Sequence, residues 1–324
     1  MSCCKACNSK NIEELYSVEA KFYYPGSFYD LVRCRDCELI FLKTGYNLDD
    51  IGDLYPDDYH PHTPDRNKFL PLRNKLMTTL RRFIFTAKHP EESEQYRSLK
   101  KLLSFLYNKT AYRSIPYYRG GGQVLDIGCG TGAYLALMKR LGFVVQGVEP
   151  DKGAALYAQR SGFKVIHGTF EKASYPENYF DIITMWHVLE HFNNPVAVLK
   201  KIGKILKDDG QLLIGIPNYS SLDRMIFREN WNGFEIPLHL NHFTPSSISA
   251  VAQMAGFRCN NIIHTIRPSD MVSSICNFFG NENRIIDNIF IKKILFFLFI
   301  PVSVLNSVLR HSSILVIQME KMSL

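Results

Sequence analysis

Short apolar runs alternate with amphipathic helical patterns through the second half of the chain. Apolar runs bounded by turn residues predict β-strands, whereas apolar residues that recur every three to four positions predict helices. Five strands are predicted here: Gln123–Ile127, Phe143–Val148, Lys164–His167, Phe180–Met185 and Gln211–Ile216. Helical patterns lie between them, for example Ala133–Leu141 and Pro195–Leu206. Alternation of this kind predicts an α/β fold, in which helices cover both faces of a parallel sheet.

Two further strands are predicted, at Phe257–Ile266 and Ser313–Glu320, with an apolar insertion between them. Within the insertion, Ile294–Leu309 reads ILFFLFIPVSVLNSVL, sixteen residues without a charge. A spanning helix needs roughly 20 apolar residues, and Pro301 interrupts this one, so we expect no transmembrane span. Two alternatives stay open: helices packed in the core, or a helix that dips into a membrane surface.

The first part of the chain has a different composition. A cysteine-bearing, aromatic segment reaches to about residue 45, and two helical patterns follow at residues 69–87 and about 92–107. Between Arg66 and Arg119 there are 13 Lys or Arg and 3 Glu, whereas the whole chain has a net charge of +7. Such a basic segment favours an anionic partner. We therefore predict a head at 1–45, a basic helical connector at 46–119 and a third domain at 120–324, with a hydrophobic helical insertion at 267–312.

The strongest motif is VLDIGCGTG, in which an apolar strand ends in Asp126 and a glycine-rich turn leads into a helix. Gly128, Gly130 and Gly132 allow a sharp turn and let a ligand contact bare backbone. The N–H groups at the start of the helix can bind an anion. The G-x-G-x-G spacing differs from the G-x-G-x-x-G of dinucleotide-binding dehydrogenases, and Asp126 can face an ammonium group of the ligand.

Two later positions suit an adenosine-type ligand. Glu149 directly follows the next predicted strand, 21 residues after Gly128, where an acid can accept hydrogen bonds from both ribose hydroxyls. The alternative is a solvated acid at a strand end. Phe170 follows the third strand and can stack on an adenine ring, although a phenylalanine at this position can equally belong to the core.

Together with the glycine turn, the segments YFDIITMWHVLEHFNNP and LKDDGQLLIGIPN resemble the motifs of class I S-adenosylmethionine (SAM) methyltransferases over about Gln123–Phe257. This resemblance implies a Rossmann-like seven-stranded sheet with an antiparallel last strand. It also implies that SAM binds along the carboxyl edge of the early strands. By this resemblance, the methionine end of SAM is bound by Asp126, Gly128, Gly130 and Gly132. The ribose is bound by Glu149, and the wall near the sulfonium is formed by Trp186 and His187.

His187, Glu190 and His191 also form an H-x-x-E-H pattern, which is typical of a zinc-protease family and would place the three residues on one helix face. We favour the methyltransferase interpretation, because an L-E-H stretch occupies the same place in that resemblance. Some quinone O-methyltransferases resemble this stretch and bind a divalent metal through acids here. This chain has His187 where they carry an acid, so we do not expect a catalytic metal.

Methyl transfer requires a positioned acceptor and removal of its proton. Candidates for the proton acceptor lie after the fifth strand, in the segment WNGFEIPLHLNHFT, because loops at the carboxyl ends of strands carry substrate groups in this architecture. His239 is the first candidate for the general base, followed by His242 and Glu235. The alternative for a loop histidine is a hydrogen bond to a carbonyl group.

The head contains a four-thiolate set, Cys4-x2-Cys7 and Cys34-x2-Cys37. Two such pairs suit tetrahedral zinc, whereas paired redox thiols are the alternative, and Cys3 could replace Cys4. The amino-terminal residues contain no apolar run, so we expect no secretory signal and a reduced, cytoplasmic protein. A zinc-ribbon-like head before a methyltransferase resembles sugar C-methyltransferases of deoxysugar pathways. Those carry a further large carboxyl-terminal domain, whereas this chain ends four residues after its last predicted strand.

These observations predict a SAM-dependent methyltransferase with a structural zinc. Its acceptor would be a carbohydrate-type or lipid-linked small molecule in envelope polysaccharide or secondary-metabolite biosynthesis. We expect peripheral attachment to the anionic inner face of a membrane through the insertion and the basic Arg66–Arg82 helix. One alternative is an RNA methyltransferase, although the basic residues lie on an amphipathic helix rather than among stacking aromatics. Another is a membrane-docked SAM-binding module without catalysis.

Overall fold

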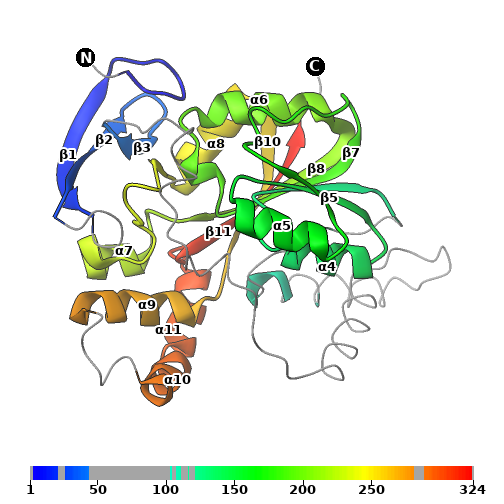
Figure 1. The fold of residues 1–324 in the computed structure, drawn as a ribbon. Coiled ribbons are helices and arrows are strands. Elements are labelled where there is room, and N and C mark those ends of the chain that lie inside the picture. Colours follow the sequence, from blue (N-terminus) through cyan, green and yellow to red (C-terminus); the bar gives the residue numbers. More distant parts are fainter. Residues whose placement is uncertain are drawn as a thin grey trace.

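The computed structural model describes residues 3–20, 26–43, 103, 107–110, 116, 121–280 and 288–322. The Arg66–Arg82 helix of the predicted connector lies outside these residues, and the second helical pattern is described only at 103 and 107–110. The described parts form a large sheet with helices on both faces, a small sheet beside it, and three helices at one end (Figure 1).

The large sheet has seven strands in the order β10-β11-β8-β7-β4-β5-β6. β11 is antiparallel to both of its neighbours, whereas the strands from β8 to β6 run parallel to one another. This confirms the predicted Rossmann-like sheet with its antiparallel last strand. The strands are β4 (Gln123–Ile127), β5 (Val144–Glu149), β6 (Lys164–His167), β7 (Phe180–Trp186), β8 (Leu206–Pro217), β10 (Phe257–His264) and β11 (Ile314–Lys321).

Successive apolar residues along each central strand point to opposite faces and build two cores. Leu125 and Ile183 belong to one buried cluster, whereas Val124 and Ile182 belong to the other. The helices α6 (Pro195–Ile205) and α8 (Pro245–Met254) cover the first face, and α4 (Ala133–Arg140) and α5 (Lys152–Arg160) cover the second (Figure 1). Burial on both faces explains why the central strands β4 and β7 are mostly apolar along their length, whereas the edge strand β6 buries only Val165.

The head forms the small sheet together with a strand from far along the chain. Its order is β1-β2-β3-β9, and β9 pairs antiparallel with β3 through Ile40–His242 and Phe41–Asn241. The strands are β1 (Ile12–Glu19), β2 (Phe28–Cys34), β3 (Ile40–Leu42) and β9 (Asn241–His242). One face of this sheet packs into the large core through Val32, and the other packs against Trp231 and Phe234. The head is thereby fixed against the loop that follows β8.

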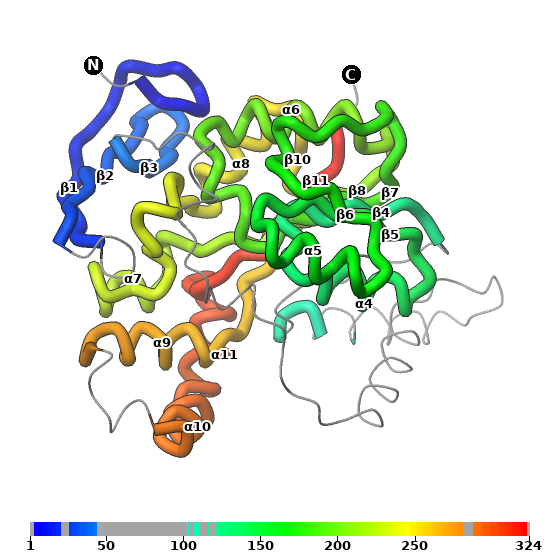
Figure 2. The backbone as a smooth tube through the Cα atoms, viewed as in Figure 1, coloured from blue at the N-terminus to red at the C-terminus, as the bar shows by residue number. Residues whose placement is uncertain are grey.

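The insertion between β10 and β11 is helical, as predicted, and lies at one end of the molecule (Figure 2). It contains α9 (Pro268–Phe279), α10 (Ile289–Leu298) and α11 (Ile300–Val308). The last two are bent by 42° at their junction, where Pro301 lies in the first turn of α11. Among the described residues, no helix alone has the length and apolarity to cross a bilayer, whereas this bent pair meets the criterion together.

Candidate functional site

The glycine-rich turn lies at the carboxyl edge of the large sheet, between β4 and α4. Gly128, Gly130 and Gly132 have φ angles of 68°, 53° and 83°, in the left-handed region that glycine adopts at little cost. Asp126 is buried just before the turn, where its Oδ1 accepts a hydrogen bond of 2.6 Å from Thr184 Oγ1. The structure therefore brings the four predicted residues together and presents main-chain groups at the edge where a ligand would bind.

Glu149 lies beside this turn because β4 and β5 are parallel neighbours. Its Oε2 accepts a hydrogen bond of 2.7 Å from Gly130 N–H, and its Oε1 accepts one of 2.9 Å from Asp151 N–H. Burial raises the pKa of Glu149 to about 7, although these two hydrogen bonds act in the opposite direction. A carboxylate at this position can accept hydrogen bonds from ribose hydroxyls.

The other predicted cofactor residues differ in their surroundings. Phe170 is buried in the core, with Lys201 Nζ 4.9 Å from its ring centre and the Tyr175 ring stacked at 6.3 Å. Trp186 is also buried, and its ring meets Tyr134 edge-on at 5.3 Å. His187, at the end of β7, instead lines an open pocket. The ligand contacts of all three residues remain predictions.

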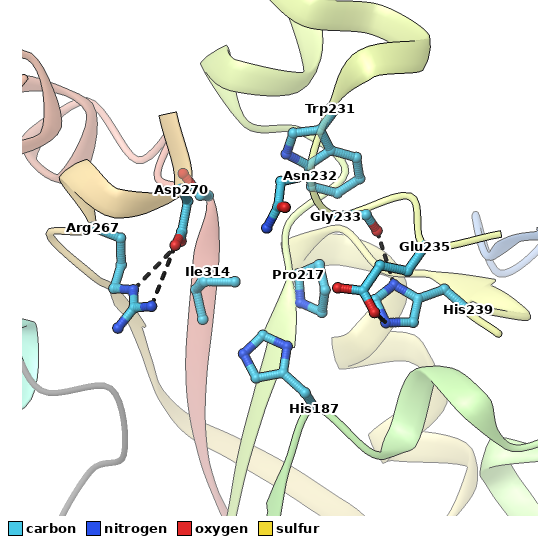
Figure 3. Close-up of a pocket in the computed structure, with 11 residues that line it drawn as sticks. His187, Pro217, Trp231, Asn232, Gly233, Glu235, His239, Arg267, Asp270 and Ile314 are labelled. Atoms are coloured by element: carbon cyan, nitrogen blue, oxygen red, sulfur yellow. Dashed lines mark hydrogen bonds and ion pairs between the residues drawn. The ribbon is translucent and has the colours of Figure 1, made fainter. Parts of the chain in front are cut away.

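The pocket has a volume of about 130 Å³ and opens beside the carboxyl end of β7 (Figure 3). Glu235 and His239 lie on one side of it, Arg267 and Asp270 lie opposite, and His187 lies between the two groups. Arg267 Nη2 is 3.3 Å from Asp270 Oδ1. The remaining lining residues are Pro217, Trp231, Asn232, Gly233, Ser313 and Ile314. A cavity of this size with polar walls can receive a small hydroxylated or anionic group.

His239 is buried at the pocket wall with one ring nitrogen committed to the backbone. Its Nδ1 lies 2.9 Å from the Gly233 carbonyl oxygen, which can only accept, so Nδ1 carries a proton and Nε2 retains a lone pair in the neutral ring. Nε2 is 3.7 Å from Glu235 Oε2 and 3.9 Å from Glu190 Oε1. Burial lowers the pKa of His239, and Glu190 partly opposes that effect. Near pH 7 the ring is therefore neutral and can accept a proton at Nε2.

Glu190 supplies a buried negative charge behind His239. Burial alone would raise its pKa, but the hydrogen bond from His187 and the charges of His239, His187 and His191 hold the pKa at about 2. His187 Nδ1 is 3.4 Å from Glu190 Oε1. Side-chain ligand atoms of Glu190, His191 and His239 lie within 4.8 Å of one another, a set that a divalent metal can also bind.

The residues of the H-x-x-E-H pattern do not share one helix. His187 has a φ of 57°, and only the short 3₁₀ helix η3 (Leu189–His191) follows it. A zinc-protease site of this pattern needs both histidines on one continuous helix. The geometry therefore agrees with the choice of the methyltransferase interpretation.

His242 lies outside the pocket lining, on β9. Its ring is buried between Phe234 at 5.3 Å and Tyr219 at 5.9 Å. Burial lowers the pKa of His242 to about 3. Of the three predicted catalytic residues, the structure thus brings His239 and Glu235 into the pocket and places His242 in an aromatic cluster against the head.

The four predicted zinc ligands of the head converge. Cys4 Sγ is 3.5 Å from Cys37 Sγ, Cys7 Sγ is 3.5 Å from Cys34 Sγ, and all four sulfurs lie within 4.8 Å of one another. Tetrahedral zinc, with Zn–S distances of about 2.3 Å, requires sulfurs about 3.8 Å apart. The donor set and its spacing therefore fit zinc. Cys4 belongs to this cluster, whereas Cys3 is exposed and lies outside it.

Comparison with known proteins shows the family to which this chain belongs. A family model described as a methyltransferase domain matches residues 92–261, more than half of the chain. The chain belongs to the class I SAM-dependent methyltransferase family. This confirms the resemblance drawn from the glycine turn and the later motifs, and it supports SAM as the cofactor of the methyltransferase domain.

The methyltransferase domain is similar to curated ubiquinone biosynthesis O-methyltransferases. It is 35% identical to that of Klebsiella pneumoniae subsp. pneumoniae over 106 residues, which cover 30% of this chain and 43% of that protein. It is 33% identical to that of Bradyrhizobium diazoefficiens over 125 residues, which cover 37% of this chain and 45% of that protein. The chain thus spans less than half the length of these curated relatives.

Solved structures with a similar fold include two methyltransferases. A SAM-dependent methyltransferase from Archaeoglobus fulgidus is 22% identical, with 68% of this chain and 94% of that chain covered and a TM-score of 0.45. A possible histamine N-methyltransferase from Thermotoga maritima is 19% identical, with 69% and 96% covered and a TM-score of 0.44.

Three residues of this region did not emerge as site residues from the sequence: Glu190, next to His239, and Arg267 and Asp270, on the opposite wall of the pocket. Glu190 was visible within the H-x-x-E-H pattern, but its part as a charge partner of His239 depends on the fold. Arg267 directly follows the predicted sixth strand. Because β10 and β8 are both antiparallel to β11, their carboxyl ends meet at the same edge of the sheet. The charged residue Arg267 after the sixth strand could therefore have been predicted from the sequence as a site residue.

Proposed function

We propose that this chain transfers a methyl group from SAM to a hydroxyl group of a carbohydrate-type or lipid-linked small molecule, in envelope polysaccharide or secondary-metabolite biosynthesis. The observation that carries the proposal is the placement of His239. Its basic Nε2 lies at the wall of a 130 Å³ pocket that also contains His187, directly after β7. β7 pairs with β4, so the pocket and the glycine turn lie at the same edge of the sheet.

The chemistry follows from these positions. When bound, SAM supplies an electrophilic methyl group on its sulfonium, and the main chain of the glycine turn and the Glu149 carboxylate are the groups that would hold it. His239 Nε2 accepts the acceptor's hydroxyl proton while the new oxygen–carbon bond forms. Glu190 Oε1, 3.9 Å away, stabilises the imidazolium that results. The pocket positions the hydroxyl group for in-line displacement.

Two observations support an oxygen acceptor. A hydroxyl group needs a base during methylation, whereas a neutral amine already offers a lone pair, and His239 is poised as such a base. The similar curated proteins are named as O-methyltransferases. Arg267 and Asp270 on the opposite wall supply a donor and an acceptor for further hydroxyl or anionic groups of the acceptor.

Zinc has a structural part in this proposal. Cys4, Cys7, Cys34 and Cys37 would hold it and join the turn before β1 to the turn between β2 and β3. A closed four-thiolate set leaves no open coordination position, so the residues around His239 carry the chemistry.

The test is incubation of the full chain with methyl-labelled SAM and cell extract, followed by separation of lipid, sugar and RNA fractions. Label in an alkali-stable ether of a sugar or lipid-linked fraction, absent with His239→Ala, is the expected result. Label in RNA would replace the acceptor assignment. Tight SAM binding without transfer to any fraction would instead indicate a binding module.

A further inference from the structure

The helices α10 and α11 present apolar side chains to the outside of the molecule. Within α10, all of whose residues are described, no side chain is buried. Ile289 is 73% exposed and Phe297 68% exposed, and on α11 Val308 is 67% exposed. Exposed apolar patches of this kind on a soluble protein indicate a binding surface. The exposed large apolar residues here are Ile289, Phe290, Ile294, Phe296, Phe297, Leu298, Val304, Leu305, Val308 and Leu309.

α11 has its polar side facing the protein and its apolar side facing out. Ser303, Asn306 and Ser307 are buried, whereas Val304 and Val308 are exposed. The buried face is tied down by hydrogen bonds, since Ser303 Oγ accepts from Arg267 N–H at 2.7 Å and Ser307 Oγ accepts from Lys109 Nζ at 3.0 Å. A helix at a water-facing surface shows the opposite arrangement. The outer face of α11 is therefore matched to an apolar environment.

α10 requires such an environment on several sides at once. At 100° per residue, its six exposed large apolar side chains spread over about 200° of the helix circumference. A protein partner that docks on one helix face covers a narrower stripe, whereas a helix that is apolar over most of its circumference is typical of a lipid or core environment. This distribution favours lipid over a second copy of the chain.

The positive charge of the segment that contains α10 and α11 favours an anionic lipid. From Asn288 to His311 the sequence contains Lys292, Lys293 and Arg310 and no Asp or Glu. Cations on an apolar wedge are attracted to anionic headgroups. α10 has ten residues and a length of about 15 Å, half of the roughly 30 Å hydrocarbon core. The polar face of α11 is buried against the protein and hydrogen-bonded to it, so the pair enters one leaflet rather than crossing.

We propose that α10 and α11 form a wedge that inserts into the outer part of an anionic lipid leaflet. Phe278 and Phe279, exposed at the end of the neighbouring helix α9, extend the apolar surface. The hydrogen bond from Arg267 to Ser303 links the wedge to the wall of the pocket. Lipid insertion thus brings the acceptor pocket to the membrane surface, where a lipid-linked acceptor would be presented. Only that last step depends on the function proposed above.

The test measures binding of the full chain to sedimented vesicles of phosphatidylcholine, with and without phosphatidylglycerol. We expect binding that strengthens with phosphatidylglycerol and weakens when salt is raised to 1 M, where the Debye length falls to about 3 Å. Phe296→Ser/Phe297→Ser/Leu298→Ser should weaken binding at least 10-fold at both salt concentrations. Lys292→Gln/Lys293→Gln should remove most of the phosphatidylglycerol dependence. Leu156→Ser/Tyr157→Ser on α5, also exposed apolar positions, is the matched control and should bind like wild type.

Insertion itself is measured with Phe297→Trp, whose fluorescence brominated lipids should quench, whereas the buried Trp186 and Trp231 should stay unquenched. Light scattering without vesicles distinguishes a second copy from lipid. A stable dimer that the serine variant dissociates, together with no vesicle binding by wild type, would overturn the proposal. Supernatant protein at low salt with anionic vesicles would overturn it as well. Neither outcome depends on methyl transfer, so each leaves the proposed function standing.

Discussion

Glu149 Oε2 and the main-chain nitrogen of Gly130 are joined by a hydrogen bond of 2.7 Å. The acid that ends β5 is thus held against the middle glycine of the turn that follows β4. Two positions that the sequence separates by 19 residues form one unit, because the parallel pairing of β4 and β5 places their carboxyl ends side by side. A ligand that contacts the turn meets a carboxylate that is already oriented, which lowers the entropic cost of binding.

Replacing this carboxylate should weaken SAM binding. Glu149→Gln keeps the size of the side chain and removes the charge, and hydrogen bonds to charged groups contribute about 1.5–3 kcal/mol. We therefore expect the dissociation constant for SAM to rise about 10- to 100-fold in titration calorimetry. Glu177→Gln is the control, because Glu177 is an exposed acid that also precedes β7 in the sequence, and it should bind SAM like wild type. Equal affinities of the two variants would remove Glu149 from the cofactor site.

The same carboxyl group should make the stability of the ligand-free protein depend on pH. Burial raises the pKa of Glu149 from 4.5 to about 7, so between these values the folded state binds more protons than the unfolded state. The protonated form contributes about 3 kcal/mol to the free energy of unfolding below pH 4.5. This contribution is lost as pH rises through about 7. Thermal unfolding should show wild type losing more stability than Glu149→Gln between pH 5 and 8. Parallel curves for the two proteins would contradict this.

Gly128 should tolerate no side chain, because a Cβ there would collide with Val188. Gly162 has a similar backbone conformation without such a neighbour, so it separates the steric effect from the conformational one. A Cβ at Gly128 would lie 2.4 Å from Val188 Cγ2, whereas a Cβ at Gly162 would meet nothing within 4 Å, and both have positive φ, 68° and 84°. Gly162→Ala should cost only the left-handed backbone conformation, about 1–2 kcal/mol. Gly128→Ala adds overpacking of about 1–3 kcal/mol and should also weaken SAM binding. Urea unfolding and calorimetry measure both; equal losses for the two variants would mean that the turn adjusts.

The sheet and its glycine turn were predictable because their signals are local. Burial on both faces makes Gln123–Ile127 and Phe180–Met185 mostly apolar, and the positive φ angles at Gly128 and Gly130 favour glycine. The antiparallel last strand came from the resemblance to the family. These features do not depend on residues far away in the chain.

The link between head and pocket was not predictable, because tertiary contacts alone create it. β9 has only two residues, which is too short for any periodic pattern, and its place is set by Leu42 N–H donating to Leu240 O and by Leu240 N–H donating to Glu190 O. For the same reason, the sequence could rank His239 before His242 but could not show that only His239 lines the pocket. They stand three positions apart in one segment, and only the folded loop turns the first to the pocket and the second to Phe234.

Zinc should therefore affect the pocket as well as the head. One zinc per chain should copurify under reducing conditions, and Cys34→Ser should lower the zinc content and the melting temperature, because loss of a thiolate removes much of the metal's binding free energy. Because β9 pairs with β3, amide hydrogen exchange at residues 238–243 should accelerate in the same variant. Cys3→Ser, outside the cluster, should change none of these quantities. Zinc-free wild-type protein with unchanged stability would rule out the assignment.

His239→Ala should reduce kcat about 10²-fold or more while SAM affinity holds, as expected for loss of a general base. His242→Phe keeps an aromatic ring between Phe234 and Tyr219 and should leave kcat close to wild type. Should His242→Phe instead lose turnover and His239→Ala retain it, the catalytic assignment would pass to His242.

Glu190→Gln tests whether the buried charge positions and tunes that base. Glu190 raises the pKa of His239 against the larger lowering effect of burial, so its neutralisation should lower the His239 pKa further. His239 acts as a base only when its ring is neutral, so kcat should fall at acidic pH with the pKa of His239, which lies below the ordinary histidine value of about 6.5. In the variant this fall in kcat should occur at still lower pH. Turnover on the plateau should fall, since Glu190 Oε1, 3.9 Å from Nε2, no longer stabilises the imidazolium. A merely structural residue would lower stability and leave unchanged the pH at which kcat falls.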